Sequence, residues 1–270
     1  MNLTESNYYG RSANRKYFSV SQFKQFLKCP ACAMASLAGT WKQPPSRALL
    51  LGSLMDELLT GTGESLAAFL EANKPDIYKR GGEYRADVEE ALETYKRILA
   101  QPEMMRYLSG EHQTIMTGEI EGVPFKIKMD SYDPGRFIAD LKYMASLRSP
   151  NLFTPMVEYW GYDMQAACYQ EIVRQNTGDK LPFFFVVATK EKPAHLALGQ
   201  ISQANMDKAM DTVRKNIARF QRIKRGEEDA ERCDAYDCAY CTATKTITAP
   251  IDTDLFGMSA AQIRGMDGIV

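Results

Sequence analysis

Residues 137–144, "FIADLKYM", form a short apolar stretch that carries two opposite charges near its middle. Its apolar and aromatic content predicts a β-strand. Alternate side chains of a strand share one face, so we expect Asp140 and Lys142 to point the same way, with Leu141 on the opposite face. A strand that only had to be buried would not carry both charges, and the stretch is therefore a candidate functional site.

The segment before this strand predicts a partner for Asp140. Residues 112–144 alternate apolar and polar side chains and are interrupted by turn residues at 121–122 and 133–135, which predicts an antiparallel meander of three strands. With the second turn at the centre, Asp130 falls opposite Asp140, to within one residue of register. Two facing carboxylates repel each other unless a cation lies between them, and such hard oxygen ligands favour Mg²⁺ or Mn²⁺.

Lys142 beside such a metal could orient or activate a water molecule, or stabilise charge that develops on a phosphate. The alternative is a hairpin edge, where Asp140 and Lys142 form an exposed ion pair that contributes little to stability. Asp-x-Lys alone favours this alternative, because so short a motif also occurs by chance. Asp130 across the turn makes the two interpretations about equal.

The rest of the chain predicts helices around the meander and two further strands. Residues 181–189, "LPFFFVVAT", are typical of a central strand that is covered on both faces, and 195–202 form a second short strand. A helix is expected to start with Ser21 as its N-cap and to break at Pro30. Further helices are predicted over residues 47–73, 83–109, 156–176 and 202–225. The order predicts an α/β (α+β) fold with a central mixed sheet flanked by helices.

Composition excludes some classes of protein and leaves others open. The chain has 270 residues, 45% of them hydrophobic, and a net charge of −1. A nucleic-acid enzyme can be neutral overall if its basic residues gather in one groove. The sequence has no apolar run long enough for a membrane span and no secretion signal, so we expect a cytoplasmic protein whose six cysteines stay reduced.

These residues resemble the PD-(D/E)xK nuclease superfamily, with Asp130 and then Asp140-Leu141-Lys142 as its core motif. "SVSQFKQFLKCP" at 19–30 is similar to the N-terminal helix of the RecB-like and RecE-like branch. "DMQAACYQEIV" at 163–173 supplies Gln165 and Tyr169, which match the Q-x-x-x-Y motif of that branch. Four-residue spacing puts both side chains on one helix face, where they can reach the same site.

The resemblance implies a restriction-endonuclease-like core over residues 17–241. A helical insertion would lie at about 57–110, with an N-terminal arm at 1–16 and a C-terminal tail at 242–270.

The resemblance also assigns roles. Asp130, Asp140 and the Leu141 carbonyl would bind the metal, Lys142 would serve the nucleophilic water, and Gln165 and Tyr169 would position DNA or support the metal ligands. DNA contacts are further predicted for the strand residues Lys126 and Lys128. Where the family often has histidine in G-x-x-x-H, this chain has Asp56 after Gly52. Asp56 is the predicted extra metal ligand, with Glu57 or a purely solvated Asp56 as alternatives.

The cysteines predict a second metal site. Cys238 and Cys241 have the C-x-x-C spacing that lets two thiolates bind one metal. Some RecB-like nucleases use one N-terminal and three C-terminal cysteines for an iron–sulfur cluster, an arrangement that Cys29, Cys233, Cys238 and Cys241 resemble. The ligand set suits [4Fe–4S] or zinc. Cys32 in place of Cys29, or reduced thiols without metal, are the alternatives.

The predicted function is a Mg²⁺-dependent or Mn²⁺-dependent exodeoxyribonuclease that hydrolyses linear DNA in phage or prophage recombination or repair. The resemblance implies a single-strand-annealing partner and a homo-oligomer. One alternative is a RecB-like nuclease without processive resection. The other is a DNA-binding module with a degenerate catalytic site and a structural metal on the cysteines.

Overall fold

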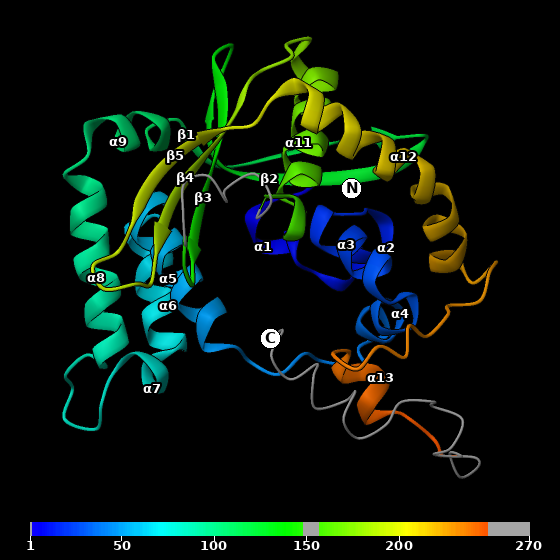
Figure 1. The fold of residues 1–270 in the computed structure, drawn as a ribbon, viewed down its shortest axis with the longest axis horizontal. Coiled ribbons are helices and arrows are strands. Elements are labelled where there is room, and N and C mark those ends of the chain that lie inside the picture. The colour runs from blue at the N-terminus through cyan, green and yellow to red at the C-terminus, as the bar shows by residue number, and fades with distance from the viewer. Residues whose placement is uncertain (1, 148–156, 248–270) are drawn as a thin grey trace, which may run out of the picture. The chain divides into compact units, whose positions relative to one another are not determined.

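The computed structural model describes residues 2–147 and 157–247, in two compact units that meet in the sequence at Cys233 and Asp234. The first unit holds a five-stranded sheet whose strands follow one another in sequence order (Figure 1). All neighbouring strands are antiparallel except β3 and β4, which are parallel, so the predicted mixed sheet is confirmed. The strands are β1 (Glu111–Ile120), β2 (Val123–Asp133), β3 (Phe137–Met144), β4 (Phe183–Thr189) and β5 (Leu196–Gln200).

The parallel pair at the centre of the sheet follows from the apolar run in β4. Parallel strands need a crossover connection, which here contains the helix α11 (Tyr162–Thr177). Phe183 and Phe185 of β4 lie in one core cluster, and Val186 and Ala188 lie in another on the opposite face. The expected strand with two covered faces is therefore confirmed.

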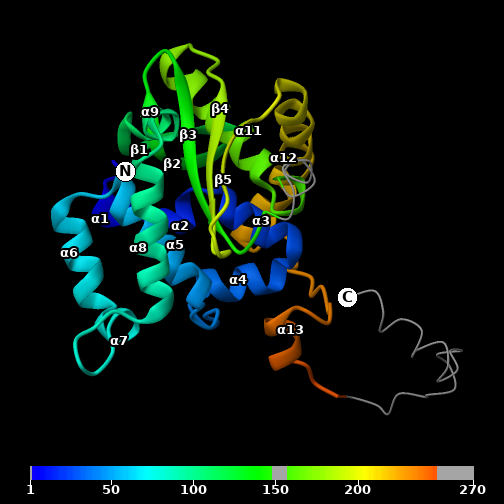
Figure 2. The same cartoon turned by 60° about the vertical axis from the view of Figure 1, so that its left-hand side comes forward.

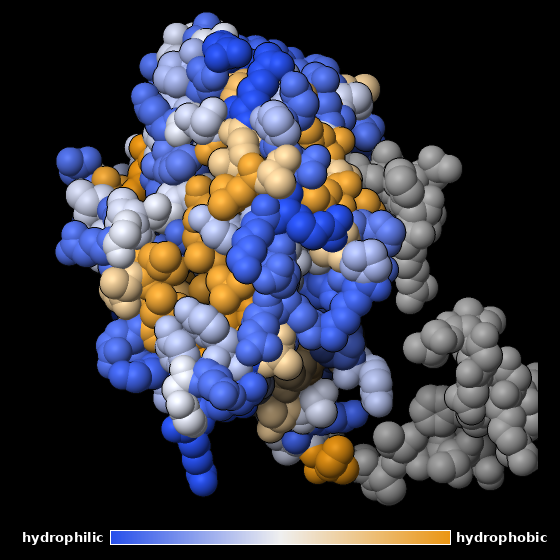
Figure 3. All heavy atoms as spheres, turned by 90° about the vertical axis from the view of Figure 1, so that its left-hand side faces the viewer, coloured by the Kyte–Doolittle hydropathy of each residue, from blue (hydrophilic) through white to orange (hydrophobic). Residues whose placement is uncertain are grey.

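Helices cover both faces of the sheet, and Figure 2 separates the two groups. The first core cluster is shared by the sheet with α11, α3 (Val20–Lys28), α4 (Pro30–Ala38) and α12 (Gln203–Arg225). The second cluster is shared with α5 (Arg47–Thr60), α7 (Lys74–Ile77), α8 (Ala86–Leu99) and α9 (Pro102–Leu108), and α6 (Gly63–Ala72) packs against it. On the side of α8, apolar side chains reach the surface between charged ones (Figure 3), as is usual for helices with one buried face.

Three helix ends show where local sequence decides the structure. The N-cap of α3 is Ser19, whose hydroxyl accepts a hydrogen bond from the Gln22 N–H over 3.3 Å, so the prediction of Ser21 was wrong. Pro30 begins α4 directly after Cys29, as expected. The single helix predicted at 83–109 is divided into α8 and α9 before Pro102, because proline lacks the N–H that a continuous helix needs.

Two short helices precede the core of the first unit. They are α1 (Glu5–Tyr8) and α2 (Arg11–Lys16), and we call them the N-terminal arm. The second unit contains α13 (Ala239–Ala243). Residues 248–270 of the predicted tail, and 148–156 before α11, lie outside the described residues. Across the described ranges, no helix is both long enough and apolar enough to cross a membrane.

Candidate functional site

Asp130 in β2 and Asp140 in β3 lie opposite each other, one position beyond the last paired residues of the two strands. The last pair of the ladder is Ser131 with Ala139, and the two aspartates come next in the same register. The backbone N–H of Leu141 donates a hydrogen bond to Oδ2 of Asp130 over 2.9 Å. The two carboxylates therefore lie on adjacent strands, as the turn at 133–135 predicts, at a position where the ladder no longer joins them.

Asp140 and Lys142 form a buried ion pair that a glutamine holds from α11. The ammonium of Lys142 contacts Oδ2 of Asp140, and the side chain of Asp140 is buried. The amide of Gln165 donates to Oδ1 of Asp140 over 2.5 Å and accepts from Lys142 over 3.0 Å. The alternative of an exposed hairpin ion pair is therefore wrong. Leu141 points to the other face of the sheet, into the second core cluster.

These side chains line a cavity of about 530 Å³, which we call the carboxylate cavity. Asp56 reaches it from α5, which Leu54, Met55 and Leu59 attach to the second core cluster. The lining also includes Glu57, whose carboxylate accepts a hydrogen bond from the Ser65 hydroxyl over 2.6 Å. The predicted residues in its wall are Asp56, Lys128, Asp130, Asp140, Leu141, Lys142, Gln165 and Tyr169.

The carboxylates in this cavity oppose one another's ionisation. Burial raises the pKa of Asp56 to about 7, and the charge of Asp140 adds to the effect. Burial, together with Asp140 and Asp56, also raises the pKa of Asp130 well above its usual range. For Lys142, burial acts to lower the pKa, but Asp140 and Asp130 outweigh it and the net direction is upward. The cavity is lined by five carboxylates and two ammonium groups, so acidic side chains outnumber basic ones.

This arrangement fits a divalent cation. Oδ2 of Asp140 is buried, and the described residues offer it the ion pair with Lys142 but no well-oriented hydrogen bond. A cation would favour the ionised forms of Asp56 and Asp130, which burial and mutual repulsion disfavour. Carboxylate oxygens are the ligands that Mg²⁺ and Mn²⁺ prefer. The donor set therefore suits either ion, as the sequence predicts.

Tyr169 ties α11 to β2 beside the carboxylates. It lies one turn after Gln165, and its hydroxyl donates a hydrogen bond to the carbonyl of Lys128 over 3.0 Å. Burial raises its pKa well above the usual range, so the side chain remains a neutral phenol. The ammonium of Lys128 lies 3.7 Å from the Glu5 carboxylate, at the wall of the cavity. Tyr169 thus supports the site through the backbone of β2.

Lys126 occupies a different environment from the one that a DNA contact requires. Its side chain is 1% exposed, and its ammonium donates hydrogen bonds to the Tyr8 carbonyl and, over 2.6 Å, to Oδ1 of Asn14. The ammonium also lies 4.5 Å from the centre of the Tyr8 ring. Lys126 therefore anchors the N-terminal arm, and the DNA contact predicted for it does not fit this position.

Two residues near the site were missed by the sequence reasoning. Tyr9, at the end of α1, lines the carboxylate cavity with an exposed aromatic ring. Lys24, on α3, donates a hydrogen bond to the Trp160 carbonyl over 2.9 Å, and the nearby Lys142 helps burial to lower its pKa to about 8. The aromatic pair at 8–9 in a polar segment was the available signal for Tyr9.

The predicted cysteine ligands are distributed over both units. In the first unit, Cys29 is the N-cap of α4 and accepts a hydrogen bond from the Cys32 N–H over 3.4 Å. The N–H of Ala31 donates to the Glu231 carbonyl over 3.0 Å, which brings the segment before Cys233 to the start of α4. In the second unit, α13 has Cys238 as its N-cap and contains Cys241. Cys168 lies in the first core cluster and is not part of this set.

Comparison with known proteins finds similarity to a family model and to solved structures. A family model described as "PDDEXK-like domain of unknown function (DUF3799)" matches residues 19–244. A crystal structure of a protein named "Putative exonuclease", from Eubacterium rectale, is 40% identical in sequence and superimposes with a TM-score of 0.86. The alignment covers 96% of this chain and 99% of that one. No curated protein matches the sequence.

Proposed function

The chain belongs to the PDDEXK-like family, within the PD-(D/E)xK nuclease superfamily, and from this premise we propose that it is a metal-dependent exonuclease that hydrolyses linear DNA. The family match and the structural neighbour together support a nuclease. The observation that carries the finer proposal is the convergence of Asp130, Asp140 and Asp56 with Lys142 in one cavity. The exonuclease activity is taken from the name of the neighbour.

In the proposed reaction, Asp130, Asp140 and Asp56 hold a Mg²⁺ or Mn²⁺ ion, with the Leu141 carbonyl as a further ligand. The ion supplies Lewis-acid polarisation of the phosphate when bound. The raised pKa of Lys142 keeps its side chain an ammonium, which can orient the attacking water and stabilise charge on the phosphate oxygens.

The amide of Gln165 fixes the relative position of Asp140 and Lys142, and so prepares this geometry before substrate arrives. Tyr169 positions β2 through the Lys128 carbonyl, and the side chain of Lys128 remains a proposed DNA contact at the wall of the cavity.

The assay that tests the proposal compares linear duplex DNA with a covalently closed circle of the same sequence, in Mg²⁺ and without it. We expect mononucleotide release from the linear DNA only, and none without the divalent ion. Nicking of the circle would favour a RecB-like nuclease that acts inside the strand. Binding without any cleavage would favour the alternative of a DNA-binding module, and would contradict the proposal.

The biological setting rests on the family resemblance alone. We propose a role in phage or prophage recombination or repair, with a single-strand-annealing partner and assembly into a homo-oligomer. Pull-down with a purified annealing protein, and light scattering of the nuclease alone, would test these two features separately from the activity.

We further propose that Cys29, Cys233, Cys238 and Cys241 bind a [4Fe–4S] cluster or zinc. The proposal is supported by their sequence spacing and by the position of Cys238 and Cys241 at the start of α13, where residues three apart lie on one side of a helix.

After anaerobic purification, a cluster is expected to give visible absorbance and about four iron atoms per chain. Zinc would give one metal atom per chain and no colour. Cys238→Ser is expected to lose the metal, whereas the core residue Cys168 serves as the control in Cys168→Ala. Metal content that is unchanged in Cys238→Ser, or absent from the wild type, would contradict the assignment.

A further inference from the structure

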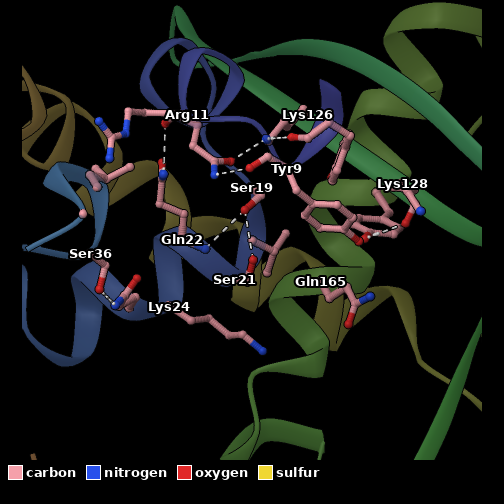
Figure 4. Close-up of a pocket in the computed structure, with 17 residues that line it drawn as sticks. Tyr9, Arg11, Ser19, Ser21, Gln22, Lys24, Ser36, Lys126, Lys128 and Gln165 are labelled. Carbon is pink, nitrogen blue, oxygen red and sulfur yellow. Dashed lines mark hydrogen bonds between the residues drawn. The ribbon is translucent and has the colours of Figure 1, made fainter. Parts of the chain in front are cut away.

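The start of β1 forms one wall of the carboxylate cavity, through His112 and Gln113. On another side the cavity adjoins a second one, of about 490 Å³, which is drawn in Figure 4 and shares Lys128 and Gln165 with it. Of these two cavities, Gln113 lines only the one that holds the carboxylates. A role for Gln113 is therefore to be sought at the carboxylates themselves.

Gln113 has a backbone conformation that is unusual for its residue type. Its φ is +54°, in the left-handed region that glycine, asparagine and aspartate enter most readily. A β-bulge is the usual reason for such a residue in a strand, but a bulge inserts one residue. Here His112 faces Ser131 and Thr114 faces Met129, so the register of β1 and β2 is the same on both sides of Gln113. The left-handed conformation therefore does not serve to shift the register.

The irregular position lies opposite a predicted metal ligand. By register Gln113 faces Asp130, and this is the one pair that is missing from an otherwise continuous ladder of β1 and β2. The pairing of β2 with β3 also ends one residue away from Asp130. Asp130 thus lies at a gap in both ladders. Backbone strain is found mainly at functional sites, where the surrounding structure holds it in place.

Contacts on both sides of the strand hold the start of β1 in this conformation. The N–H of Gly110 donates a hydrogen bond to the Ser131 hydroxyl over 3.1 Å, and Nε2 of His112 donates to the Leu108 carbonyl over 2.6 Å. A Cβ atom on Gly110 would lie 2.6 Å from the Tyr132 carbonyl oxygen, so the two chains approach closely here. The backbone before Gln113 is therefore fixed against β2 and α9.

The side chain of Gln113 connects β1 to the helix that carries Asp56. Its Nε2 donates to the Thr60 hydroxyl over 2.7 Å, and that hydroxyl donates to the Asp56 carbonyl over 2.9 Å. The second bond is common for threonine within a helix, whereas the first comes from a strand 53 residues away in the sequence. Thr60 is 2% exposed, so water does not compete for its hydroxyl.

The left-handed backbone is consistent with this connection. Neighbouring side chains of a regular strand point to opposite faces, yet His112 and Gln113 both line the carboxylate cavity. The departure from regular strand geometry at Gln113 lets its amide reach the last turn of α5 while β1 keeps its register.

We propose that Gln113 is a positioning residue for the metal site, which fixes the end of α5 against β1 and β2 so that Asp56 and Asp130 reach the same ion. The inference rests on the proposed function, in which both aspartates hold the ion. Gln113 itself contacts neither the ion nor the substrate, and it acts through Thr60. Removal of such an outer contact typically lowers metal affinity about 10–100-fold.

Mn²⁺ binding to the full-length protein, measured by titration calorimetry without DNA, tests this role. Gln113→Asn tolerates the left-handed conformation but is one methylene too short to reach Thr60, and is expected to weaken Mn²⁺ binding about tenfold or more. Thr60→Val removes the hydroxyl at similar volume and is expected to have the same effect. The double variant is expected to bind no more weakly than either single one, because both changes break one connection. The matched control is Gln43→Asn, at an exposed glutamine.

Two comparisons separate positioning from a general loss of stability. In Asp56→Asn protein, Gln113→Asn is expected to cause no further loss of Mn²⁺ affinity, because the ligand that it positions is absent. Gln113→Gly is expected to unfold about 2–4 °C above Gln113→Ala, since glycine relieves the left-handed strain. Both variants lack the amide, so their Mn²⁺ affinities are expected to be equally low despite this difference in stability.

Additive effects of Gln113→Asn and Asp56→Asn on Mn²⁺ affinity would overturn the role of Gln113. So would a Gln113→Asn variant whose affinity stays within about twofold of wild type, the range expected of the Gln43→Asn control. Wild-type protein that binds no Mn²⁺ would contradict the proposed function and this role with it. Wild-type protein that cuts linear DNA while the two substitutions act additively would contradict the role of Gln113 alone, so the two failures are distinguishable.

Discussion

Replacing Lys142 by alanine is expected to slow DNA hydrolysis by about 10²–10⁴-fold while DNA binding in Ca²⁺ changes little. The reason is that Lys142 is the cationic side chain that contacts both Asp140 and Gln165 in the carboxylate cavity. Without it, no ammonium orients the water or stabilises charge on the phosphate. The measurement is single-turnover release of nucleotides from linear duplex DNA, with protein in excess.

The substitution also removes the partner of a buried carboxylate, which lowers stability by about 3–5 kcal/mol in comparable cases. Thermal unfolding in Mg²⁺ must therefore show that the variant is folded at the assay temperature. Lys142→Met paired with Asp140→Asn keeps the volume without leaving an unpaired charge, and is expected to be equally inactive. Lys180→Ala, at an exposed lysine, is the control. Activity of Lys142→Ala within tenfold of wild type would rule out the mechanism.

The metal-free protein is expected to lose stability as the pH rises from about 4 to about 7. The pKa of Asp56 is 3.8 in an ordinary environment and about 7 in the folded protein. Between these values the folded state binds a proton that the unfolded state has already released. Raising the pH therefore favours unfolding, by up to about 1.4 kcal/mol per pH unit for one such group. Asp130, whose pKa is also raised, acts in the same direction.

Urea denaturation of chelator-treated protein between pH 4 and pH 8 measures this loss. Asp56→Asn removes one titrating group and is expected to flatten the profile, and Mg²⁺ is expected to restore more stability at pH 8 than at pH 5 because it binds the ionised carboxylates. The control Glu93→Gln changes an exposed carboxylate on α8 and should leave the slope unchanged. A profile that is flat in the wild type, or unaltered by Asp56→Asn, would contradict the interpretation.

Much of this site could be predicted because its central residues lie on locally patterned segments. Alternation in 137–144 places Asp140 and Lys142 on one face, and the turn at 133–135 determines the register of Asp130. Four-residue spacing on α11 brings Gln165 and Tyr169 together. Each of these relations spans a few residues or one tight turn, so the sequence contains the information that determines it.

The features of the site that could not be predicted depend on which segments cover the sheet. Local sequence patterns carry no information about this. Lys126 and Lys128 alternate along β2 in the same way, yet the N-terminal arm covers Lys126 and leaves Lys128 at the cavity. Tyr9 and Lys24 reach the site from segments that precede β2 by 99 residues or more in the sequence. Their positions follow from tertiary packing, which decides the environment of a strand residue more than its periodicity does.

The hydrogen bond from the Leu141 N–H to Asp130 makes a single backbone proton sensitive to the charge of the cavity. An amide proton that is shared with a carboxylate changes its resonance frequency when that carboxylate gains a proton or coordinates an ion. In a ¹⁵N-labelled sample, the Leu141 cross-peak would therefore report ion arrival at Asp130 directly. The Leu141 amide is thus an intrinsic probe of the site, and ion binding can be followed without attaching a label to a side chain.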